Sequence, residues 1–262
     1  MTMVRLENIS SGYNGEVILH DIDLTINSGE IVGILGPNGS GKTTLLRTIS
    51  RILAPCAGKV FFEDKDMAHY AIKELAKKIA VVSQDVEVEH MTVEEYVLLG
   101  RLPHYGSWQF FETGKDRDVA ATYMNMTDII QYRERQLDRI SGGEKQLAHI
   151  AKALAQQPRL LLLDEPTSYL DITHQVKIMD LIRKLNRELG ITILMVLHDL
   201  NIASEYSDRL VLMNNGAIVK TGDPDTVLTY QNIEEVYKTR VVVKKSPVSG
   251  KPHVMIVPGD MV

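Results

Sequence analysis

The stretch Ile31-Val32-Gly33-Ile34-Leu35-Gly36-Pro37-Asn38-Gly39-Ser40-Gly41-Lys42-Thr43 decides the fold of this 262-residue chain. Its first five residues form an apolar run with the length of a buried strand. The next eight, residues 36–43, match G-x-x-x-x-G-K-[ST] at every fixed position, and a helical pattern covers 40–52. A strand that enters a helix through a glycine-rich loop is typical of an α/β fold.

Other apolar runs on both sides of this stretch extend the same pattern. Strands are predicted at 79–82, 160–163, 191–197 and 210–213, and helices at 141–157, 174–189 and 200–207. Because strands alternate with helices, we expect a mixed, mostly parallel sheet with helices on its faces. In contrast, the apolar segments 4–9 and 17–26 flank the turn-rich residues 10–15, which predicts an antiparallel N-terminal β part.

The pattern changes again in two later regions. Between about residues 85 and 157 the strand pattern disappears, and helical patterns interrupted by glycine and proline predict a helical insertion. Near the end, 241–243 and 254–257 predict a hairpin. We therefore expect one domain, with a core formed by 1–84 and 158–262, a helical subdomain over 85–157 and a terminal hairpin within 240–262.

Composition and charge exclude several classes of protein. There are 29 Lys and Arg against 34 Asp and Glu, a net charge of -5, which disfavours a nucleic-acid partner. The single cysteine, Cys56, leaves no internal disulfide and is consistent with the cytoplasm. The longest apolar run, Ile193 to Leu197, is far too short to cross a bilayer, and no signal peptide is evident at the N-terminus. Attachment to a membrane would therefore need a protein partner and not direct lipid insertion.

The glycine-rich loop has the chemistry of a phosphate-binding loop. Its glycines let successive backbone amides point at phosphate oxygens, and the following helix adds its positive dipole end. Lys42 would contact the β- and γ-phosphates, and the hydroxyl of Thr43 is a ligand that Mg²⁺ prefers. An ordinary strand-to-helix turn would not need this lysine and threonine. The expected nucleotide-binding residues are Gly36, Pro37, Asn38, Gly39, Ser40, Gly41, Lys42, Thr43 and Thr44.

Two carboxylates end the predicted strand over 160–163. The carboxyl end of a buried parallel strand faces the crevice where ligands of open α/β sheets bind. We expect Asp164 to hold Mg²⁺ through water, and Glu165 to polarise the water that attacks the γ-phosphate. By itself the pair could equally mark a strand leaving the core. Beside a complete phosphate loop it favours ATP hydrolysis.

The segment Ile140-Ser141-Gly142-Gly143-Glu144-Lys145-Gln146 resembles the signature motif of ATP-binding cassette (ABC) proteins. A serine that caps a surface helix would explain it alone, but the resemblance extends over roughly residues 4 to 257. It implies that Ser141, Gly142 and Gly143 contact the γ-phosphate of a nucleotide held by a second copy of the chain. Two chains would then enclose two ATP molecules.

The remaining motifs of that family occur in order. The resemblance implies that Tyr13 stacks on adenine, although packing on neighbouring strands explains this tyrosine nearly as well. It makes Gln84 the residue of the glutamine loop and a further Mg²⁺ ligand, and it places Asp171 in the D-loop over 168–171. His198 matches the switch histidine near the γ-phosphate. With Lys42 and Glu165, this histidine completes the expected catalytic set.

Other features resemble one branch of the family, the importers of iron-siderophore, haem and vitamin B12 complexes. Glu144 replaces the usual glutamine as in that branch, and the segments 92–104 and 250–253 are similar to it. Ile140 for leucine is a conservative change, whereas Leu147 for arginine has no explanation in the sequence. The resemblance implies an ATPase that uses ATP and Mg²⁺ as a homodimer on the inner face of the membrane. Permease subunits and a substrate-binding protein would complete the importer.

Alternatives remain at this point. A molybdate importer has a similar architecture, and a soluble ABC ATPase of iron-sulfur assembly, translation or DNA repair is the candidate from another class. A non-catalytic nucleotide-binding module is disfavoured, because Glu165 and His198 are both present.

The resemblance also implies that residues 84–110 dock a helix of the membrane subunit. Acidic residues gather there, and they either form a solvated face or meet basic residues of that subunit. These residues are Asp85, Glu87, Glu89, Glu94 and Glu95. His69, His90 and His104 lack the spacing of a helical ligand pair, so we expect no histidine metal site.

Overall fold

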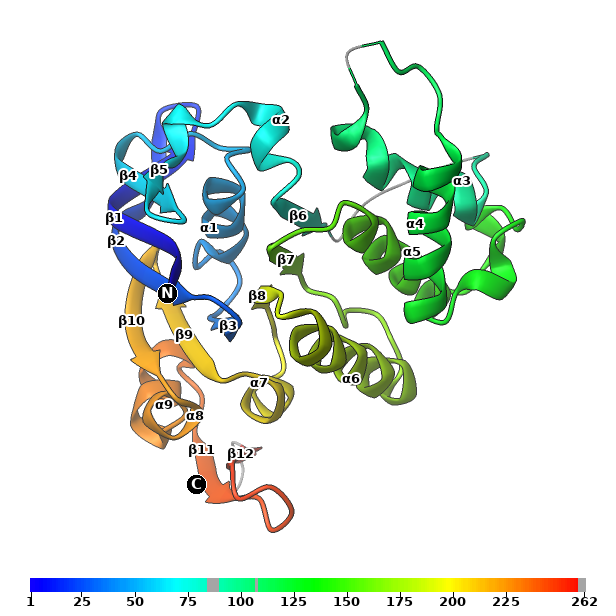
Figure 1. The fold of residues 1–262 in the computed structure, drawn as a ribbon. Coiled ribbons are helices and arrows are strands. Elements are labelled where there is room, and N and C mark those ends of the chain that lie inside the picture. The colour runs from blue at the N-terminus through cyan, green and yellow to red at the C-terminus, as the bar shows by residue number, and fades with distance from the viewer. Residues whose placement is uncertain (84–89, 107, 259–262) are drawn as a thin grey trace. The chain divides into compact units, whose positions relative to one another are not determined.

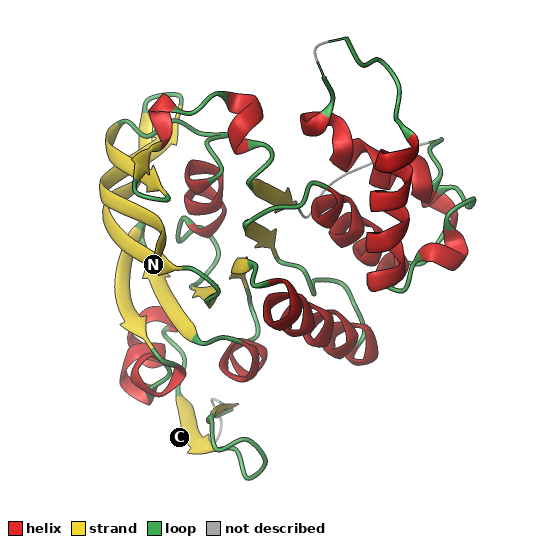
Figure 2. Cartoon of the chain, viewed as in Figure 1, coloured by secondary structure: helices red, strands yellow, loops and turns green. Residues whose placement is uncertain are grey.

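The computed structural model describes residues 1–83, 90–106 and 108–258, so Gln84 and the acids Asp85, Glu87 and Glu89 lie outside the described residues. The chain divides into two compact units, Met1–His69 with Thr192–Val262, and Tyr70–Ile191. Figure 2 shows that strands dominate the first unit and helices the second. The subdomain boundaries expected near residues 84 and 157 stay a prediction.

The first unit contains the antiparallel part predicted at the N-terminus (Figure 1). β1 (Thr2–Tyr13) and β2 (Glu16–Asn27) form a long hairpin, and β4 (Ala57–Phe62) and β5 (Lys65–Asp66) extend it in the order β2-β1-β4-β5. Both hairpin strands run beyond their apolar segments, because the turn Asn14-Gly15 closes the ladder at Tyr13 and Glu16. The antiparallel prediction is confirmed.

A second sheet in this unit contains the strand before the phosphate loop. β3 (Ile31–Leu35) lies between β8 (Thr192–Val196) and β9 (Arg209–Asn214), parallel to both, and β10 (Ala217–Gly222) pairs antiparallel with β9. Every residue of β3 and β8 is buried, as expected of parallel strands covered on both faces. Together with the parallel pair of the second unit, this confirms the mixed, mostly parallel α/β fold.

Helices and a terminal hairpin complete the first unit. α1 (Lys42–Ile49) follows the phosphate loop, and α7 (Leu200–Tyr206) follows β8. After β10 come α8 (Pro224–Val227) and α9 (Tyr230–Tyr237). β11 (Val241–Lys245) and β12 (Pro252–Ile256) then pair antiparallel, which confirms the predicted hairpin.

The second unit joins one strand pair to the helical insertion. β6 (Ile79–Val82) and β7 (Leu160–Asp164) are parallel. Its α-helices are α2 (Ile72–Leu75), α3 (Val93–Leu98), α4 (Gly114–Met126), α5 (Gly142–Ala155) and α6 (Ile172–Leu189). Its 3₁₀ helices are η2 (Leu99–His104), η3 (Ile130–Tyr132) and η4 (Leu137–Arg139). Gly114 is one of the glycines that interrupt the helical pattern predicted between 85 and 157, but it begins α4, because Thr113 and Asp116 form a capping box there. None of the described helices is both long and apolar enough to span a bilayer.

Candidate functional site

The phosphate loop has a backbone that only glycine can follow at two positions. Gly36 and Gly41 have φ angles of 153° and 98°, which L side chains rarely adopt. A Cβ atom on Gly36 would lie 2.3 Å from the carbonyl oxygen of Met213, and one on Gly41 would lie 2.7 Å from Cδ2 of Leu19. The loop therefore fits tightly between β9 and β2, and larger residues at these positions would displace it.

Polar groups gather at this loop as the sequence predicts. Lys42 is 6% exposed, and its ammonium group donates hydrogen bonds to the carbonyl oxygens of Gly36 at 2.8 Å and Pro37 at 2.9 Å. The hydroxyl of Ser40 is buried and has no hydrogen-bond partner among the residues that the structure describes. A buried cation, an unpaired hydroxyl and the first turn of α1 fit an anionic ligand such as a phosphate chain.

The predicted adenine-stacking residue Tyr13 belongs to the same unit. It ends β1, and its hydroxyl accepts a hydrogen bond of 3.1 Å from Arg47 of α1. The guanidinium of Arg47 also lies 5.9 Å from the centre of the Tyr13 ring. These contacts tie the ring to the helix that starts at the phosphate loop, while its role toward adenine stays a prediction.

The switch residue His198 leaves the sheet at the same edge as the phosphate loop. Val196 of β8 is the register partner of Ile34 of β3. The backbone amide of Leu197 donates a hydrogen bond of 3.1 Å to the carbonyl oxygen of Ile34. The chain then turns into His198, which is exposed, just as it turns into Gly36 after β3. The first unit therefore brings the phosphate loop and His198 to one edge of the sheet.

The two predicted carboxylates end β7 in the second unit. Asp164 is the last residue of the strand, and Glu165 follows with a φ of 53°, in the left-handed region. Strained backbone of this kind is common at functional sites, where it fixes the direction of a side chain. The carboxylate of Glu165 accepts a hydrogen bond of 2.8 Å from the hydroxyl of Ser168.

The signature motif forms the start of α5 in the same unit. Ser141 is the N-cap residue, and its hydroxyl accepts a hydrogen bond of 3.3 Å from the amide of Glu144. The carboxylate of Glu144 in turn accepts one of 2.7 Å from the amide of Ser141. Hydrogen bonds from the hydroxyl of Tyr132, and next from the Ser141 amide, lower the pKa of Glu144. Glu144, which replaces the usual glutamine of the signature motif, is therefore part of a capping box.

The signature helix also approaches α6, the helix that follows the D-loop segment. A Cβ atom on Gly143 would lie 2.2 Å from the ring of His174, so the glycine permits a close approach of α5 and α6. Asp171 caps α6. Its carboxylate accepts a hydrogen bond of 2.9 Å from the backbone amide of His174 and lies 2.8 Å from Nδ1 of the His174 ring. The hydrogen bond from that amide lowers the pKa of Asp171. Sequence reasoning missed His174, although a histidine three residues after a capping aspartate suggests such a pair.

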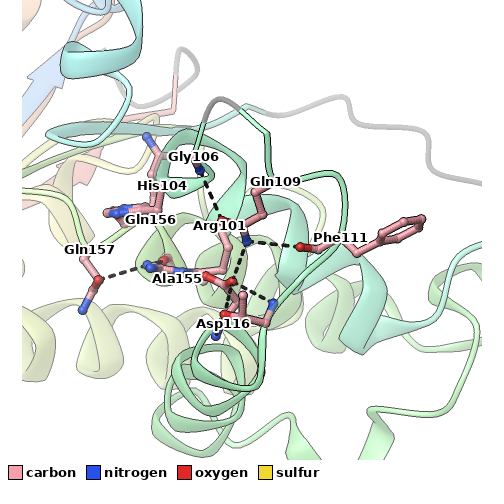
Figure 3. A network of polar contacts seen from close by, with 10 residues as sticks. Arg101, His104, Gly106, Gln109, Phe111, Asp116, Ala155, Gln156 and Gln157 are labelled. Atoms are coloured by element: carbon pink, nitrogen blue, oxygen red, sulfur yellow. Dashed lines mark hydrogen bonds and ion pairs between the residues drawn. The ribbon is translucent and has the colours of Figure 1, made fainter.

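The far end of α5 is held by a network of polar groups around the buried residues Arg101 and Asp116, shown in Figure 3. Arg101 of η2 donates hydrogen bonds to the carbonyl oxygen of Ala155 at 2.7 Å and to the side-chain oxygen of Gln157 at 3.0 Å. Its Nε also pairs with the carboxylate of Asp116 at 3.2 Å. Nε2 of His104 lies 2.9 Å from the carbonyl oxygen of Gln156. The two basic side chains therefore satisfy carbonyl groups at the C-terminal end of the signature helix.

Asp116 receives several hydrogen bonds in this network. Burial by itself raises the pKa of its carboxyl group, but hydrogen bonds from Thr113, Arg101 and Gln109 outweigh it and lower the pKa to about 2. Gln109 bridges the carboxylate of Asp116 and the carbonyl oxygen of Phe111, both at 3.1 Å. Asp116 therefore stays ionised and paired at neutral pH.

The docking surface expected at 84–110 stays a prediction, and two of its described residues are buried. Gly100 and Arg101 are buried, and a Cβ atom on Gly100 would lie 2.1 Å from the carbonyl oxygen of Lys152. These two residues pack η2 onto α5 and present nothing to a partner. The apolar residues that are exposed here and just beyond are Leu99, Leu102, Trp108, Phe110 and Phe111.

Leu147 and the candidate metal ligands are the remaining features singled out in the sequence. Leu147 is 3% exposed on α5, so an apolar residue there lies in the core. The part of the chain that the structure describes contains no group of three or more His, Cys, Asp or Glu side chains arranged to hold a metal. The oxygen ligands expected for Mg²⁺, Thr43 in the first unit and Asp164 in the second, are of the chemical type that this ion prefers.

Comparisons with known proteins agree with this arrangement. Residues 19–168 match the family described as ABC transporter. The ferric enterobactin transport ATP-binding protein FepC of Escherichia coli strain K12 is 38% identical over 256 residues, which cover 96% of this chain and 93% of FepC. An inward-facing structure described as a metal-chelate type ABC transporter has a TM-score of 0.87 at 25% identity, covering 100% of this chain and 99% of its own.

A third comparison includes the nucleotide. The dimeric post-hydrolysis structure of the ATP-binding cassette MJ0796 with ADP and Pi has a TM-score of 0.73 at 32% identity. The match covers 84% of this chain and 98% of that cassette.

Proposed function

The chain belongs to the ABC transporter family, and from this premise we propose that it hydrolyses ATP to power the import of a metal chelate through membrane permease subunits. Its similarity to FepC along nearly the whole of both chains is the observation that carries the proposal. The cargo class is an iron-siderophore, haem or cobalamin complex. The place of action is the inner face of the cell membrane, reached through the permease.

In the first unit, we assign nucleotide binding to the phosphate loop and Tyr13. The ammonium of Lys42 and the loop amides neutralise the β- and γ-phosphates, and the ring of Tyr13 supports adenine. His198 contacts the γ-phosphate region from the neighbouring strand end. The orphan hydroxyl of Ser40 and the glycine-bounded loop support this assignment.

In the second unit, we assign the chemistry to Glu165, which orients and polarises the attacking water. Its left-handed backbone and the hydrogen bond from Ser168 hold the carboxylate in one direction. Thr43, Gln84 and Asp164 would hold Mg²⁺, which when bound neutralises charge on the phosphates. Asp171 and His174 support the D-loop beside the signature residues.

Hydrolysis requires a second copy of the chain in this proposal. Ser141, Gly142 and Gly143 of one copy donate to the γ-phosphate on the other, and donors supplied in this way are worth roughly 10³ to 10⁵ in rate in comparable phosphoryl-transfer systems. Closing and opening of the pair shifts the permease between its two facing states. A substrate-binding protein delivers the cargo.

A soluble ABC ATPase of iron-sulfur assembly is the alternative from another class, and a molybdate importer is the alternative cargo. Both have less support. FepC is named for ferric enterobactin transport, and the structure reported above with a TM-score of 0.87 is described as a metal-chelate type ABC transporter.

Uptake by cells tests the proposal and its cargo together. Cells lacking this chain are complemented with the natural sequence or with Glu165→Gln, and uptake of radiolabelled ferric siderophore, haem, cobalamin and molybdate is compared. We expect one chelate to enter only with the natural sequence. Loss of molybdate uptake alone would change the cargo class, and unchanged uptake of all four would contradict import.

A further inference from the structure

The short helix α7 directly follows the switch residue His198 and its neighbour Asp199. α7 spans Leu200–Tyr206, seven residues, and isolated helices of this length are not stable in water. The carboxylate of Asp199 caps its first turn, accepting from the amides of Asn201 at 2.7 Å and Ile202 at 2.9 Å. Because His198 is joined to this cap, the position of α7 sets the position of the histidine.

The terminal hairpin holds α7 along its side. The side-chain oxygen of Asn201 accepts a hydrogen bond of 2.7 Å from the amide of Val254, and its nitrogen donates one of 3.2 Å to the carbonyl oxygen of the same residue. Val254 stands opposite Val243 of β11, so Asn201 pairs with the other edge of β12 as a neighbouring strand would. The carboxamide of asparagine supplies both the donor and the acceptor that this pairing needs.

A second side-chain contact lies one turn further along α7. Ser204 is fully buried, and its hydroxyl donates a hydrogen bond of 2.7 Å to the carbonyl oxygen of Pro252 at the start of β12. The helix is therefore attached to the strand at two successive points.

Lys251 fixes the C-terminal end of the same helix. Its ammonium group donates hydrogen bonds to the carbonyl oxygens of Ser204 and Glu205, both at 2.9 Å, and of Ser207 at 3.3 Å. A cation at this end of a helix satisfies carbonyls that have no partner within the helix and also meets the negative end of its dipole. The segment 250–253, which resembles the importer branch, thus has a definite contact partner.

The switch segment also borders open space. A cavity of about 370 Å³ is bounded by His198, Asp199 and Asn201 on one side and by α9 and the hairpin on the other. Since this space is not filled by packed side chains, the polar contacts from Asn201 and Lys251 carry more of the positioning than they would in a close-packed core.

From these contacts we propose that Asn201 and Lys251 are positioning residues for ATP hydrolysis: they fasten α7 to the terminal hairpin and thereby hold His198 in place. The proposal rests on the proposed function, which assigns His198 to the γ-phosphate region. ATP binding is assigned to the phosphate loop and Tyr13, so loss of either contact lowers kcat and leaves KM for ATP nearly unchanged.

The test is steady-state ATP hydrolysis by the purified full chain carrying Asn201→Ala or Lys251→Met. We expect kcat to fall roughly five- to tenfold and KM to stay within about twofold, while Lys251→Arg keeps most of the activity. Val248→Ser is the matched control, because Val248 lies in the hairpin turn and is 94% exposed. It should behave as the natural sequence does.

A double-variant cycle separates positioning from a general loss of stability. In a His198→Ala chain, Asn201→Ala and Lys251→Met should lower kcat no further, since they act through the missing imidazole. The proposal would be overturned if either substitution lowered kcat in the His198→Ala chain as much as it does in the natural chain. An unchanged kcat in a folded Lys251→Met chain would also overturn it. If Asn201→Ala does not fold, Lys251→Met alone decides. If His198→Ala hydrolyses ATP at the natural rate, the assignment of His198 fails instead.

Discussion

Two of the helices that follow site motifs, α5 after the signature and α7 after His198, are fastened at their C-terminal ends by a basic side chain. At α5 the cation is Arg101, whose side chain is 5% exposed and pairs with Asp116, 8% exposed. At α7 it is Lys251, which meets three backbone carbonyls. At α5 the cation that contacts the helix end also belongs to a buried ion pair, whereas at α7 the cation acts as a helix cap.

The difference follows from helix length and packing. α5 has 14 residues, eight of them buried, so its apolar face already fixes its position and the Arg101 network adds stability. α7 has seven residues, two of them buried, and takes its position from polar contacts with the hairpin. Substitutions at Arg101 should therefore act mainly on stability, and those at Lys251 mainly on turnover.

The largest effect on stability is expected from Arg101→Met. This change leaves the carboxylate of Asp116 buried without its cation, and breaking a buried pair in this way costs about 3 to 5 kcal/mol. The free energy of unfolding, measured with urea, should fall by that amount, and adding Asp116→Asn should restore part of it. Arg117→Met is the control, because the Arg117 side chain is 62% exposed and an exposed ion pair such as the one it forms with Glu112 contributes little to stability. Equal losses at the two arginines would remove the contrast.

A smaller effect is expected on acidification, through His149 of α5. Its Nδ1 lies 2.6 Å from the hydroxyl of Tyr96, and burial lowers the pKa of His149 from 6.5 to about 4. Above pH 6.5 neither the folded nor the unfolded chain protonates this residue. Between pH 6.5 and 4 only the unfolded chain does, so roughly 2 to 3 kcal/mol of stability is lost as pH falls through that window.

Urea unfolding at a series of pH values checks this expectation. His149→Gln should flatten the dependence between pH 6.5 and 4, whereas Lys251→Met should leave its slope as it is. The same slope in the His149→Gln chain would mean that another group is responsible.

The smallest effect on stability is expected at the α7 contact of Ser204. Ser204→Ala removes one buried hydrogen bond to Pro252 and should cost about 0.5 to 1.5 kcal/mol in the free energy of unfolding. The control is Ser50→Ala, which removes a comparable but exposed hydrogen bond to the carbonyl oxygen of Arg47. A loss above about 3 kcal/mol would place α7 among the elements that hold the core.

Much of the fold follows from the sequence because the buried parallel strands are continuous apolar runs. β3 and β6 begin and end at the predicted residues. β7 ends one residue later than predicted, and β9 is one residue longer at both ends. The strands β4 and β10 were not predicted, because Ala57–Phe62 and Ala217–Gly222 carry glycine and exposed residues and are set by pairing with β1 and β9.

For the site, contiguous motifs could be predicted, whereas contacts between distant segments could not. The phosphate loop was expected from its own residues, and Ser141 and His198 from the resemblance to a family; the structure places the loop and Ser141 at helix starts and His198 between β8 and α7. The joining of Arg101 to Asp116, or of Lys251 to α7, depends on tertiary packing that leaves no periodic signal. For this reason the sequence did not show that Arg101, which lies within the expected docking segment 84–110, is buried.

The central claim is that two copies of the chain close on ATP through the signature residues. Light scattering after size-exclusion chromatography of Glu165→Gln with excess ATP, against the same protein with ADP, tests it most directly. We predict a change from the 29.4 kDa monomer to twice that mass with ATP only, and no change when Ser141→Arg is added. An ATP-bound monomer, or a dimer that forms equally well with Ser141→Arg, would contradict the account.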